Sequence, residues 1–312
     1  MGLGQGAGRN HLTLMTLDHA FDAYEAARPR LPRAIAPHGT PEALESLAPL
    51  ADRFDAFLLD AFGVLNIGET AIPGAVGRVA DLQAAGKRVL IVSNAASVPH
   101  AALMEKYAKL GFRFAPEDVI TSRRTLAHHM AGGAAACWGV MTPEGIALDD
   151  LGPGEITVLG DDPAPYAAVD GFLLVGSAGW SAARQALLEG ALRARPRPVL
   201  VANPDIVAPR ETGLTAEPGH FAHQLADRTG VSPQFFGKPF ANIYDLAFAR
   251  LGDVDRSRVV MVGDSLHTDI LGAQTARVRS ALITGYGFLA GRDAGAMIAR
   301  SGIIPDFVVA SP

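Results

Sequence analysis

The chain alternates short apolar runs with longer segments of mixed polarity, and several of the apolar runs end in a polar residue. Residues 56–60 (AFLLD), 88–94 (RVLIVSN), 258–264 (RVVMVGD) and 280–287 (SALITGYG) have this form. Continuous apolar runs of this length are typical of strands in a parallel sheet that is covered on both faces. The sequence therefore predicts buried parallel strands whose carboxyl ends carry polar side chains.

Segments with a helical pattern of apolar positions lie between these runs. They are residues 75–86, 99–110, 241–251 and 268–277. Strands that alternate with helices are typical of a doubly wound parallel α/β sheet. In such a sheet the polar groups at the carboxyl ends of neighbouring strands meet at one crevice. The pattern predicts an α/β core with a candidate site at that edge.

A second set of apolar runs breaks this alternation in the middle of the chain. Residues 128–228 contain the runs GVMTPE, EITVLGD, GFLLVGS and PVLVANPD, with a helix predicted near residues 180–194. A chain of 312 residues is long enough for two domains. We expect residues 128–228 to form an inserted α/β cap domain, and residues 51–127 and 229–312 to form the core.

The N-terminal part has a weaker pattern. We expect residues 1–16 to be a disordered tail and residues 17–50 to be a helical extension. Within the extension, helices are predicted at residues 17–28 and 42–52, joined by the proline-rich connector PRLPRAIAPHG.

Composition narrows the class of protein. Hydrophobic residues make up 49% of the chain and charged residues 19%, which is typical of a folded chain with a buried core. The net charge is −5 and no dense run of Lys or Arg occurs, so we expect no nucleic-acid partner. No apolar stretch reaches the roughly 18 residues that span a bilayer, so we expect no membrane association. The single cysteine, Cys137, cannot form an intramolecular disulfide, and we expect a cytoplasmic protein.

Four polar clusters stand where strands are predicted to end. They are DAFGVL at 60–65, VSNAAS at 92–97, FGKPF at 236–240 and GDSLHTDI at 263–270. A carboxylate at a strand end can project into the crevice, a hydroxyl can bind a phosphate oxygen, and a lysine can neutralise both anions. Paired carboxylates suit a hard cation that prefers oxygen ligands. These residue types indicate a site for a phosphate group and a divalent cation.

Each cluster alone also has a simpler interpretation. Asp60 can cap a turn, and Ser93 or Asn94 can cap the next helix. Lys238 can be an exposed loop residue, and the Asn-Pro-Asp segment at 203–205 can be only a turn. The order of the clusters along the chain therefore carries more weight than any one of them.

That order resembles the four motifs of the haloacid-dehalogenase (HAD) superfamily, with Asp60, then Ser93, then Lys238, then Asp264 with Asp269. The long interval between the second and third motifs leaves room for a cap at that point. With VANPD at 201–205 and GKP at 237–239, the chain resembles the class IIA, NagD-like phosphatases. The resemblance runs from about residue 50 to residue 290.

The resemblance implies a role for each matching residue. Asp60 would attack phosphorus and form an aspartyl-phosphate, Ser93 would orient the phosphoryl group, and Lys238 would stabilise both. The implied Mg²⁺ ligands are Asp60, the backbone carbonyl of Phe62, Asp264 and Asp269. The implied substrate-binding residues are Asn94, Asn203 and Asp205. The resemblance also implies a small phosphorylated substrate and allows a homodimer formed through the cap.

Phe62 departs from the family pattern. Phosphatases of the superfamily carry a second Asp two residues after the nucleophile, which protonates the leaving oxygen and then activates water. A phenyl ring does neither, and such general acid–base help is worth about 10²–10⁴-fold. Three interpretations stay open. The substrate has a good leaving group, another residue such as His267 or one in the cap supplies the proton, or the protein is a weakly active module that binds a phosphorylated ligand.

An aromatic residue at this position also resembles the haloacid dehalogenases, which have a Tyr shortly after the nucleophile. Those enzymes work without magnesium and lack the acidic pair of the fourth motif. Asp264 and Asp269 beside Asp60 therefore favour a metal-dependent phosphatase over a dehalogenase. His267 is expected to be a surface residue at a helix start.

Overall fold

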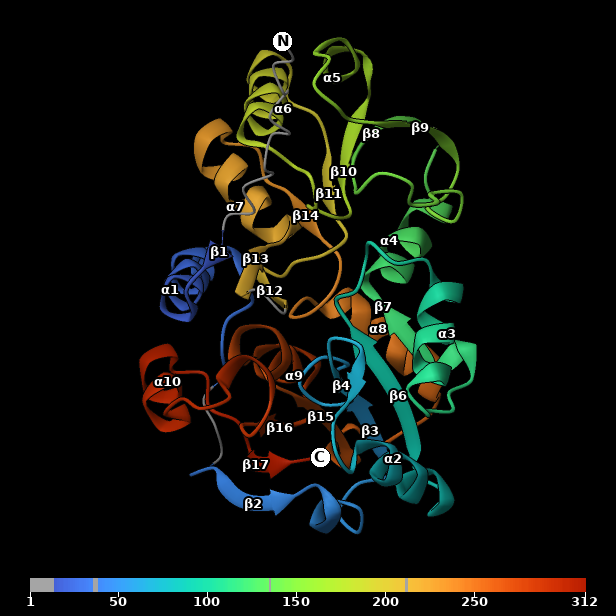
Figure 1. Ribbon diagram of the computed structural model, residues 1–312, viewed down its shortest axis with the longest axis vertical. Coiled ribbons are helices and arrows are strands. Elements are labelled where there is room, and N and C mark those ends of the chain that lie inside the picture. The colour runs from blue at the N-terminus through green and yellow to red at the C-terminus, as the bar shows by residue number, and fades with distance from the viewer. Residues whose placement is uncertain (1–13, 36–38, 135, 211–212) are drawn as a thin grey trace, which may run out of the picture.

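The computed structural model of the chain shows two lobes, each built around one large sheet (Figure 1). The structure describes residues 14–35, 39–134, 136–210 and 213–312. Most of the predicted disordered tail, residues 1–13, lies outside the described residues.

The lower lobe in Figure 1 contains a seven-stranded sheet with the strand order β2-β17-β16-β15-β3-β6-β7. Every neighbouring pair in this sheet is parallel, as the buried apolar runs predicted. Its strands are β2 (Glu42–Ser46), β3 (Ala56–Leu59), β6 (Arg88–Ser93), β7 (Val119–Thr121), β15 (Val259–Gly263), β16 (Arg279–Ile283) and β17 (Phe307–Ser311).

Helices cover both faces of this sheet. They are α2 (Ala75–Ala84), α3 (His100–Lys109), α4 (Ser122–Ala131), α8 (Ala241–Leu251), α9 (Leu271–Ala276) and α10 (Ala294–Ser301). Successive residues of β3 point to opposite faces: Phe57 packs in one cluster with residues of α2 and α3, and Leu58 packs in another with residues of α8 and α9. The predicted doubly wound α/β architecture is therefore confirmed.

The upper lobe contains a five-stranded parallel sheet with the order β14-β11-β10-β8-β9. Its strands are β8 (Ala136–Met141), β9 (Gly154–Val158), β10 (Gly171–Leu174), β11 (Val199–Val201) and β14 (Gln234–Phe235). Its helices are α5 (Ala164–Ala168), α6 (Ala182–Ala194) and α7 (Pro218–Thr229). This lobe is the inserted α/β cap, because all of these elements lie between β7 and α8 of the core.

The ends of the cap differ in detail from the sequence prediction. Gln234 and Phe235 were assigned to the core, but they form β14 and pair with β11 at the edge of the cap sheet. Two residues are too few for a hydrophobic pattern to reveal a strand. At the other end, Leu126 and Met130 of α4 pack in one cluster with cap residues such as Val140, so this helix joins the two lobes.

The N-terminal segment is more ordered than predicted. Leu14–Met15 form strand β1, which pairs antiparallel with β13 (Gly213–Ala216) of the cap, and β13 pairs with β12 (Val207–Arg210). Thr16 then caps helix α1 (Leu17–Ala27) by accepting a hydrogen bond from the backbone of His19. The prediction of disorder was wrong for residues 14–16, because Leu14 and Met15 pair with a strand far away in the sequence and Thr16 caps the next helix.

The predicted helix at residues 42–52 was also wrong. Glu42–Ser46 form β2, an edge strand parallel to β17, and only the short 3-10 turn Ala48–Leu50 is helical. The sequence EALES is rich in good helix formers, but the open edge of β17 offers a row of backbone partners and Leu44 packs against the core. Tertiary pairing thus overrides local propensity here.

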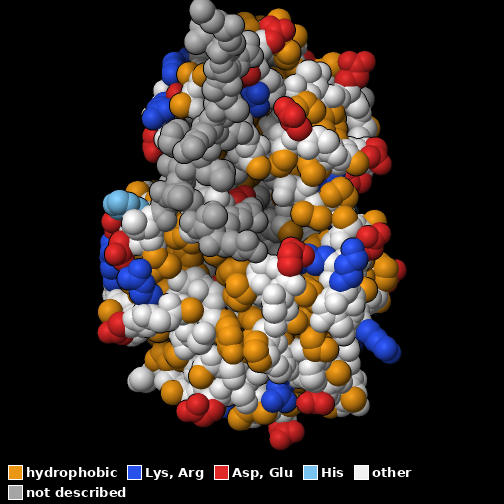
Figure 2. Space-filling model, in the orientation of Figure 1, with side chains coloured by type: hydrophobic (Ala, Val, Ile, Leu, Met, Phe, Trp, Pro, Cys, Tyr) orange, Lys and Arg blue, Asp and Glu red, His pale blue; other side chains and the backbone are white. Residues whose placement is uncertain are grey.

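The face of the molecule in Figure 2 carries positive and negative side chains spread over both lobes, without a continuous basic stripe. None of the helices in the described residues has the length and hydropathy needed to cross a membrane.

Candidate active site

A cavity of about 580 Å³ lies between the two lobes, at the carboxyl ends of the central core strands. Asp60 follows β3, Ser93 ends β6 and Asp264 follows β15, so three neighbouring strands deliver side chains to it. The sequence-predicted site residues that line it are Asp60, Phe62, Ser93, Asn94, Asn203, Asp205, Lys238 and Asp264. Asp269 lies behind this wall and is fully buried.

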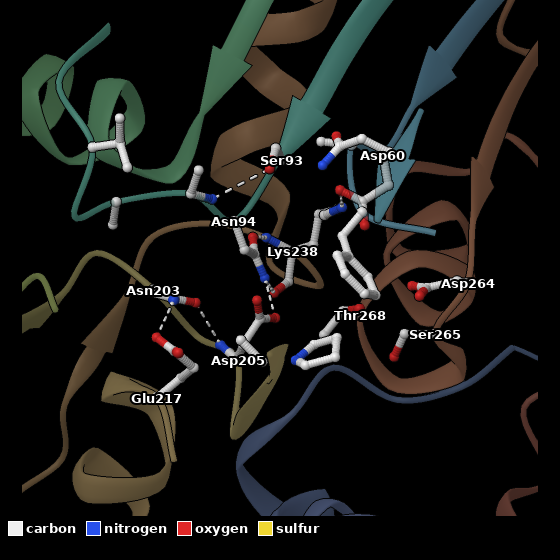
Figure 3. Close-up of a pocket in the computed structure, with 18 of the residues that line it drawn as sticks. Asp60, Ser93, Asn94, Asn203, Asp205, Glu217, Lys238, Asp264, Ser265 and Thr268 are labelled. Carbon is white, nitrogen blue, oxygen red and sulfur yellow. Dashed lines mark hydrogen bonds and ion pairs between the residues drawn. The ribbon is translucent and has the colours of Figure 1, made fainter. Parts of the chain in front are cut away.

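Lys238 occupies the centre of the site (Figure 3). Its Nζ lies 2.7 Å from Oδ1 of Asp60 and 2.7 Å from Oδ1 of Asp269, and its side chain is 2% exposed. Burial lowers the pKa of Lys238, but the carboxylates of Asp269 and Asp60 outweigh burial and leave that pKa above its ordinary value. Burial raises the pKa of Asp60 to about 6, although the neighbouring ammonium opposes the shift. The interpretation of Lys238 as an exposed loop residue is therefore wrong.

Backbone contacts hold Lys238 in place. Its N–H donates to Oδ1 of Asn94 over 2.7 Å, and its carbonyl accepts from Nδ2 of Asn94 over 3.0 Å. Gly237 before it has a φ of +134°, and a Cβ there would lie 2.1 Å from Oγ of Ser122. Glycine is thus needed at position 237, because only glycine fits between Asn94 and Ser122 at that backbone angle.

Three carboxylates meet on one side of the ammonium group. One oxygen from each of Asp60, Asp264 and Asp269 lies within 4.8 Å of the others. Oδ2 of Asp269 accepts hydrogen bonds from the backbone N–H groups of Asp264 and Ser265. Oδ2 of Asp264 accepts from the N–H of Phe288 over 2.7 Å. Asp269 lies in a π-helical turn (Leu266–Ile270) and does not cap a helix.

This donor set fits a divalent cation with a preference for oxygen ligands. Burial, then the charges of Asp269 and Asp60, raise the pKa of Asp264 well above its ordinary value. Asp60 and Asp269 share the Lys238 ammonium group, so a cation between Asp60 and Asp264 would relieve the remaining repulsion among the three carboxylates. Asp269 already uses both oxygens for Lys238 and the backbone, which makes it a residue that orients the site. Phe62 lines the cavity beside these groups.

Ser93 and Asn94 do not cap the helix that follows them. Helix α3 begins at His100 with Pro99 at its N-cap, and Ser93 accepts a local hydrogen bond from the backbone N–H of Ala95. Asn94 is bound within the protein on both sides of its amide, to Lys238, Ser122 and Asp205. Its side chain links the core to the cap, while Ser93 faces the cavity.

The Asn-Pro-Asp segment reaches the cavity from the cap. Oδ1 of Asn203 accepts from the N–H of Asp205, and Nδ2 of Asn203 donates to Glu217, so the predicted turn is present. Oδ1 of Asp205 accepts from Nδ2 of Asn94 over 2.7 Å, across the boundary between the two lobes (Figure 3). Burial raises the pKa of Asp205 to about 7, although Asn94 and Lys238 lower it. The segment is thus both a turn and part of the cavity wall.

One of the residues that line the cavity comes from helix α1, a segment whose sequence carries no functional motif. Tyr24 of α1 lines the cavity, and its hydroxyl accepts the backbone N–H of Ile206, the residue after Asp205. The only sequence signal was the amphipathic pattern of α1, which does not say what its buried face meets. Glu217 and Thr268 also line the cavity and were not predicted.

The prediction for His267 was wrong. The ring is 1% exposed, stacks on Tyr24 with centroids 4.9 Å apart, and has Nε2 2.5 Å from a carboxylate oxygen of Glu25. Burial lowers its pKa to about 4, although Glu25 opposes the shift. His267 is not among the residues that line the cavity, so it does not face a substrate.

A parallel α/β core, an inserted cap, and an aspartate beside a buried lysine and an acidic pair define a class of phosphotransfer hydrolases. Comparison with known protein families supports this class. Two family models match the chain, described as haloacid dehalogenase-like hydrolase over residues 57–149 and HAD-hydrolase-like over residues 235–311. The chain belongs to the haloacid dehalogenase-like hydrolases, in their class IIA, NagD-like branch.

Three relatives illustrate the similarity. Glycerol-3-phosphate phosphatase of Gallus gallus is 34% identical over 281 residues, which cover 82% of this chain and 89% of that protein. D-glycerol 3-phosphate phosphatase of Mycobacterium tuberculosis is 33% identical over 237 residues, covering 75% of this chain and 64% of that protein. A crystal structure of a possible sugar phosphatase from Cytophaga hutchinsonii superposes with a TM-score of 0.76 at 27% identity, covering 88% of this chain and 98% of that one.

Proposed function

We propose that this protein is a magnesium-dependent phosphatase that hydrolyses a small phosphate monoester through an aspartyl-phosphate on Asp60. The observation that carries the proposal is the position of Lys238, whose buried ammonium lies 2.7 Å from Asp60 and beside the acidic pair Asp264 and Asp269. The names of the relatives support the reaction, since each is called a phosphatase and two are called glycerol phosphate phosphatases.

The residues divide the chemistry among them. Asp60 provides the oxygen that attacks phosphorus, and Lys238 keeps that carboxylate ionised and balances the negative charge of the phosphoryl group. Ser93 donates its hydroxyl to a phosphoryl oxygen. Positioning and charge neutralisation supply most of the catalysis in phosphoryl transfer.

Mg²⁺ would be held by Asp60, Asp264 and the backbone carbonyl of Phe62, with Asp269 orienting the site, and it would neutralise charge on the phosphoryl oxygens. A structure of the M. tuberculosis glycerol phosphate phosphatase in complex with magnesium supports this choice of ion. The cap, with Asn203 and Asp205, would close over the rest of the substrate and exclude water.

The proposal is tested by measuring phosphate release with Mg²⁺ from glycerol 3-phosphate, nitrophenyl phosphate and acetyl phosphate. Asp60→Asn should lose activity by about 10³-fold or more, because the nucleophile is gone. Asp52→Asn is the matched control, since Asp52 is exposed on the core surface. If the wild-type protein binds phosphate but releases none from any substrate, the phosphate-binding module replaces the phosphatase. The homodimer through the cap stays a prediction, which light scattering after gel filtration tests.

A further inference from the structure

Phe62 leaves the proposed reaction without a proton donor at the usual position. Phe62 lines the cavity, and its ring can neither give nor accept a proton. In an in-line displacement the leaving oxygen departs on the side of phosphorus opposite to the attacking group. Asp60 attacks from the core, so the acid must reach the leaving oxygen on the side of phosphorus away from Asp60, and titratable residues of either lobe that line the cavity are candidates.

The cavity offers few groups that meet this condition. Titratable lining residues outside the cluster around Lys238 are Tyr24, Glu69, Lys106, Tyr107, Asp205 and Glu217. Lys106 and Glu69 form an ion pair with each other at the exposed rim. Burial raises the pKa of Tyr24 and of Tyr107, so both phenols are weak acids there.

The remaining candidates for the proton donor are Glu217 and Asp205, and their hydrogen bonds distinguish the two. Glu217 accepts from Nδ2 of Asn203 and from the hydroxyl of Thr215, so it supports the turn from behind. Asp205 instead projects across the lobe boundary and meets Asn94 of the core (Figure 3).

We propose that Asp205 is the general acid and then the general base of the reaction, in the place that Phe62 leaves vacant. The inference rests on the proposed function, since it names the proton donor for that reaction. A carboxyl group delivered by the cap does the task that the family usually gives to a core residue two positions after the nucleophile.

A short chain of contacts joins Asp205 to the nucleophile. Asn94 donates to Asp205 over 2.7 Å and accepts from the N–H of Lys238 over 2.7 Å, and Nζ of Lys238 lies 2.7 Å from Asp60. Figure 3 shows Asp60 and Asp205 on opposite sides of Lys238. Hydrogen bonds through Asn94 and the ion pair of Lys238 therefore connect the proposed acid to the nucleophile.

The local backbone fixes where the Asp205 carboxyl group points. Its N–H is bound to Asn203, and its carbonyl accepts from the N–H of Gly219 at the start of α7. A Cβ on Gly219 would lie 2.1 Å from the carbonyl oxygen of Pro204, so the helix packs directly against the turn. A rigid turn of this kind suits a group that must meet a leaving oxygen in one orientation.

The electrostatic surroundings suit proton transfer near neutral pH. Burial raises the pKa of Asp205 to about 7, with Asn94 and Lys238 opposing the shift and Asp60 and Glu217 adding to it. A general acid is most effective when its pKa lies near the working pH, because both protonation states are then accessible.

The proton balance closes over the two steps. In the first, a carboxylate oxygen of Asp60 bonds to phosphorus, the ester P–O bond breaks with its electron pair staying on the leaving oxygen, and Asp205 gives that oxygen its proton. In the second, the Asp205 carboxylate takes a proton from water while the water oxygen bonds to phosphorus. The bond from phosphorus to Asp60 then breaks, which regenerates the Asp60 carboxylate, protonated Asp205 and inorganic phosphate.

Asp205→Asn tests the inference when two leaving groups are compared. Alkoxide departure from glycerol 3-phosphate needs a proton, so the first step on this substrate should slow by about 10²–10⁴-fold. Nitrophenolate departs without one, so the burst of nitrophenol in a single turnover should be nearly unchanged. Asp149→Asn, at an exposed cap position, should leave both rates unchanged.

A second variant separates proton transfer from structural damage. Phe62→Asp restores the usual family arrangement, so Phe62→Asp with Asp205→Asn should recover glycerol 3-phosphate turnover by at least tenfold over Asp205→Asn alone. Equal losses on both substrates, with no recovery, overturn the inference. So does a wild-type protein that hydrolyses nitrophenyl phosphate but no alkyl phosphate, an outcome that leaves the proposed function standing. Failure of the proposed function shows separately, as activity that persists in Asp60→Asn.

Discussion

At the scale of single residues, the site depends on one buried positive charge. Lys238 is buried, and Asp60 and Asp269 share its ammonium group. Burying ions is costly, and a buried pair offsets that cost only while both signs are present. Lys238 therefore contributes to the stability of the folded state as well as to the proposed reaction.

Lys238→Met should remove activity and also destabilise the protein, because Asp60 and Asp269 would stay buried without a counter-charge. The expected loss in the free energy of unfolding is about 3–5 kcal/mol. Urea titration followed by circular dichroism measures it. Lys109→Met, at an exposed position of α3, is the control. A variant as stable as that control would show that the buried ion pairs contribute nothing net.

The raised pKa of Asp205 also predicts how the stability of the protein depends on pH. Its pKa is raised from 3.8 to about 7 in the folded protein, so between these values the folded state holds a proton that the unfolded state releases. The contribution to stability is complete below about pH 4 and is lost as pH rises through about 7. Asp205→Asn should remove this dependence.

The measurement is the melting temperature of both proteins at several pH values, without metal. The melting temperature of Asp205→Asn relative to wild type should rise between pH 4 and pH 8. A constant difference across that range would mean that Asp205 titrates normally.

At the scale of elements, helix α1 ties the cap to the core. Phe21 and Tyr24 pack in one cluster with Ile206 of the cap and with Leu266 and Ile270 of the motif around Asp269. The helix therefore contacts both walls of the cavity, although it lies outside the segments that carry the family motifs.

Tyr24→Phe should destabilise the protein by about 1–3 kcal/mol, because the buried N–H of Ile206 loses its acceptor. Urea titration reports the loss. Tyr286→Phe is the matched control, since among the described residues no hydrogen bond to the Tyr286 hydroxyl is found. Equal stability of the two variants would mean that water replaces the lost contact.

The loop before α8 makes a second prediction at this scale. Gly237→Ala places a Cβ 2.1 Å from Ser122 and 2.6 Å from Asn94 at a φ of +134°, so the loop must move and carry Lys238 with it. Activity should fall by at least tenfold, with a lower melting temperature. Gly160→Ala, where a Cβ meets nothing within 4 Å, should change neither property.

At the scale of the whole molecule, the three neighbouring carboxylates of Asp60, Asp264 and Asp269 predict that a bound cation stabilises the fold. Mg²⁺ at 100 times its dissociation constant should add about 2.7 kcal/mol to the free energy of unfolding. Thermal unfolding with Mg²⁺ and with a chelator measures the difference. Asp264→Asn should lose most of the gain, and an equal gain in that variant would place the ion elsewhere.

Local pattern was enough to predict much of the fold. Buried parallel strands can be recognised in the sequence, because both faces of the sheet are covered and each strand is therefore a continuous apolar run. Ala56–Leu59 and Val259–Gly263 are examples. The order of the strand-end clusters then indicated the family. The residues that match the family motifs and line one cavity are Asp60, Ser93, Lys238 and Asp264.

The tertiary structure alone decided which groups meet across long intervals of sequence. Asn94 and Asp205 are 111 residues apart, Tyr24 and Ile206 are 182 apart, and His267 is buried by a helix 242 residues before it. Sequence pattern reports the period of burial along one element, but it does not say which other element supplies the burial. For the same reason the residues 42–46 follow the free edge of β17 into a sheet, although their composition favours a helix.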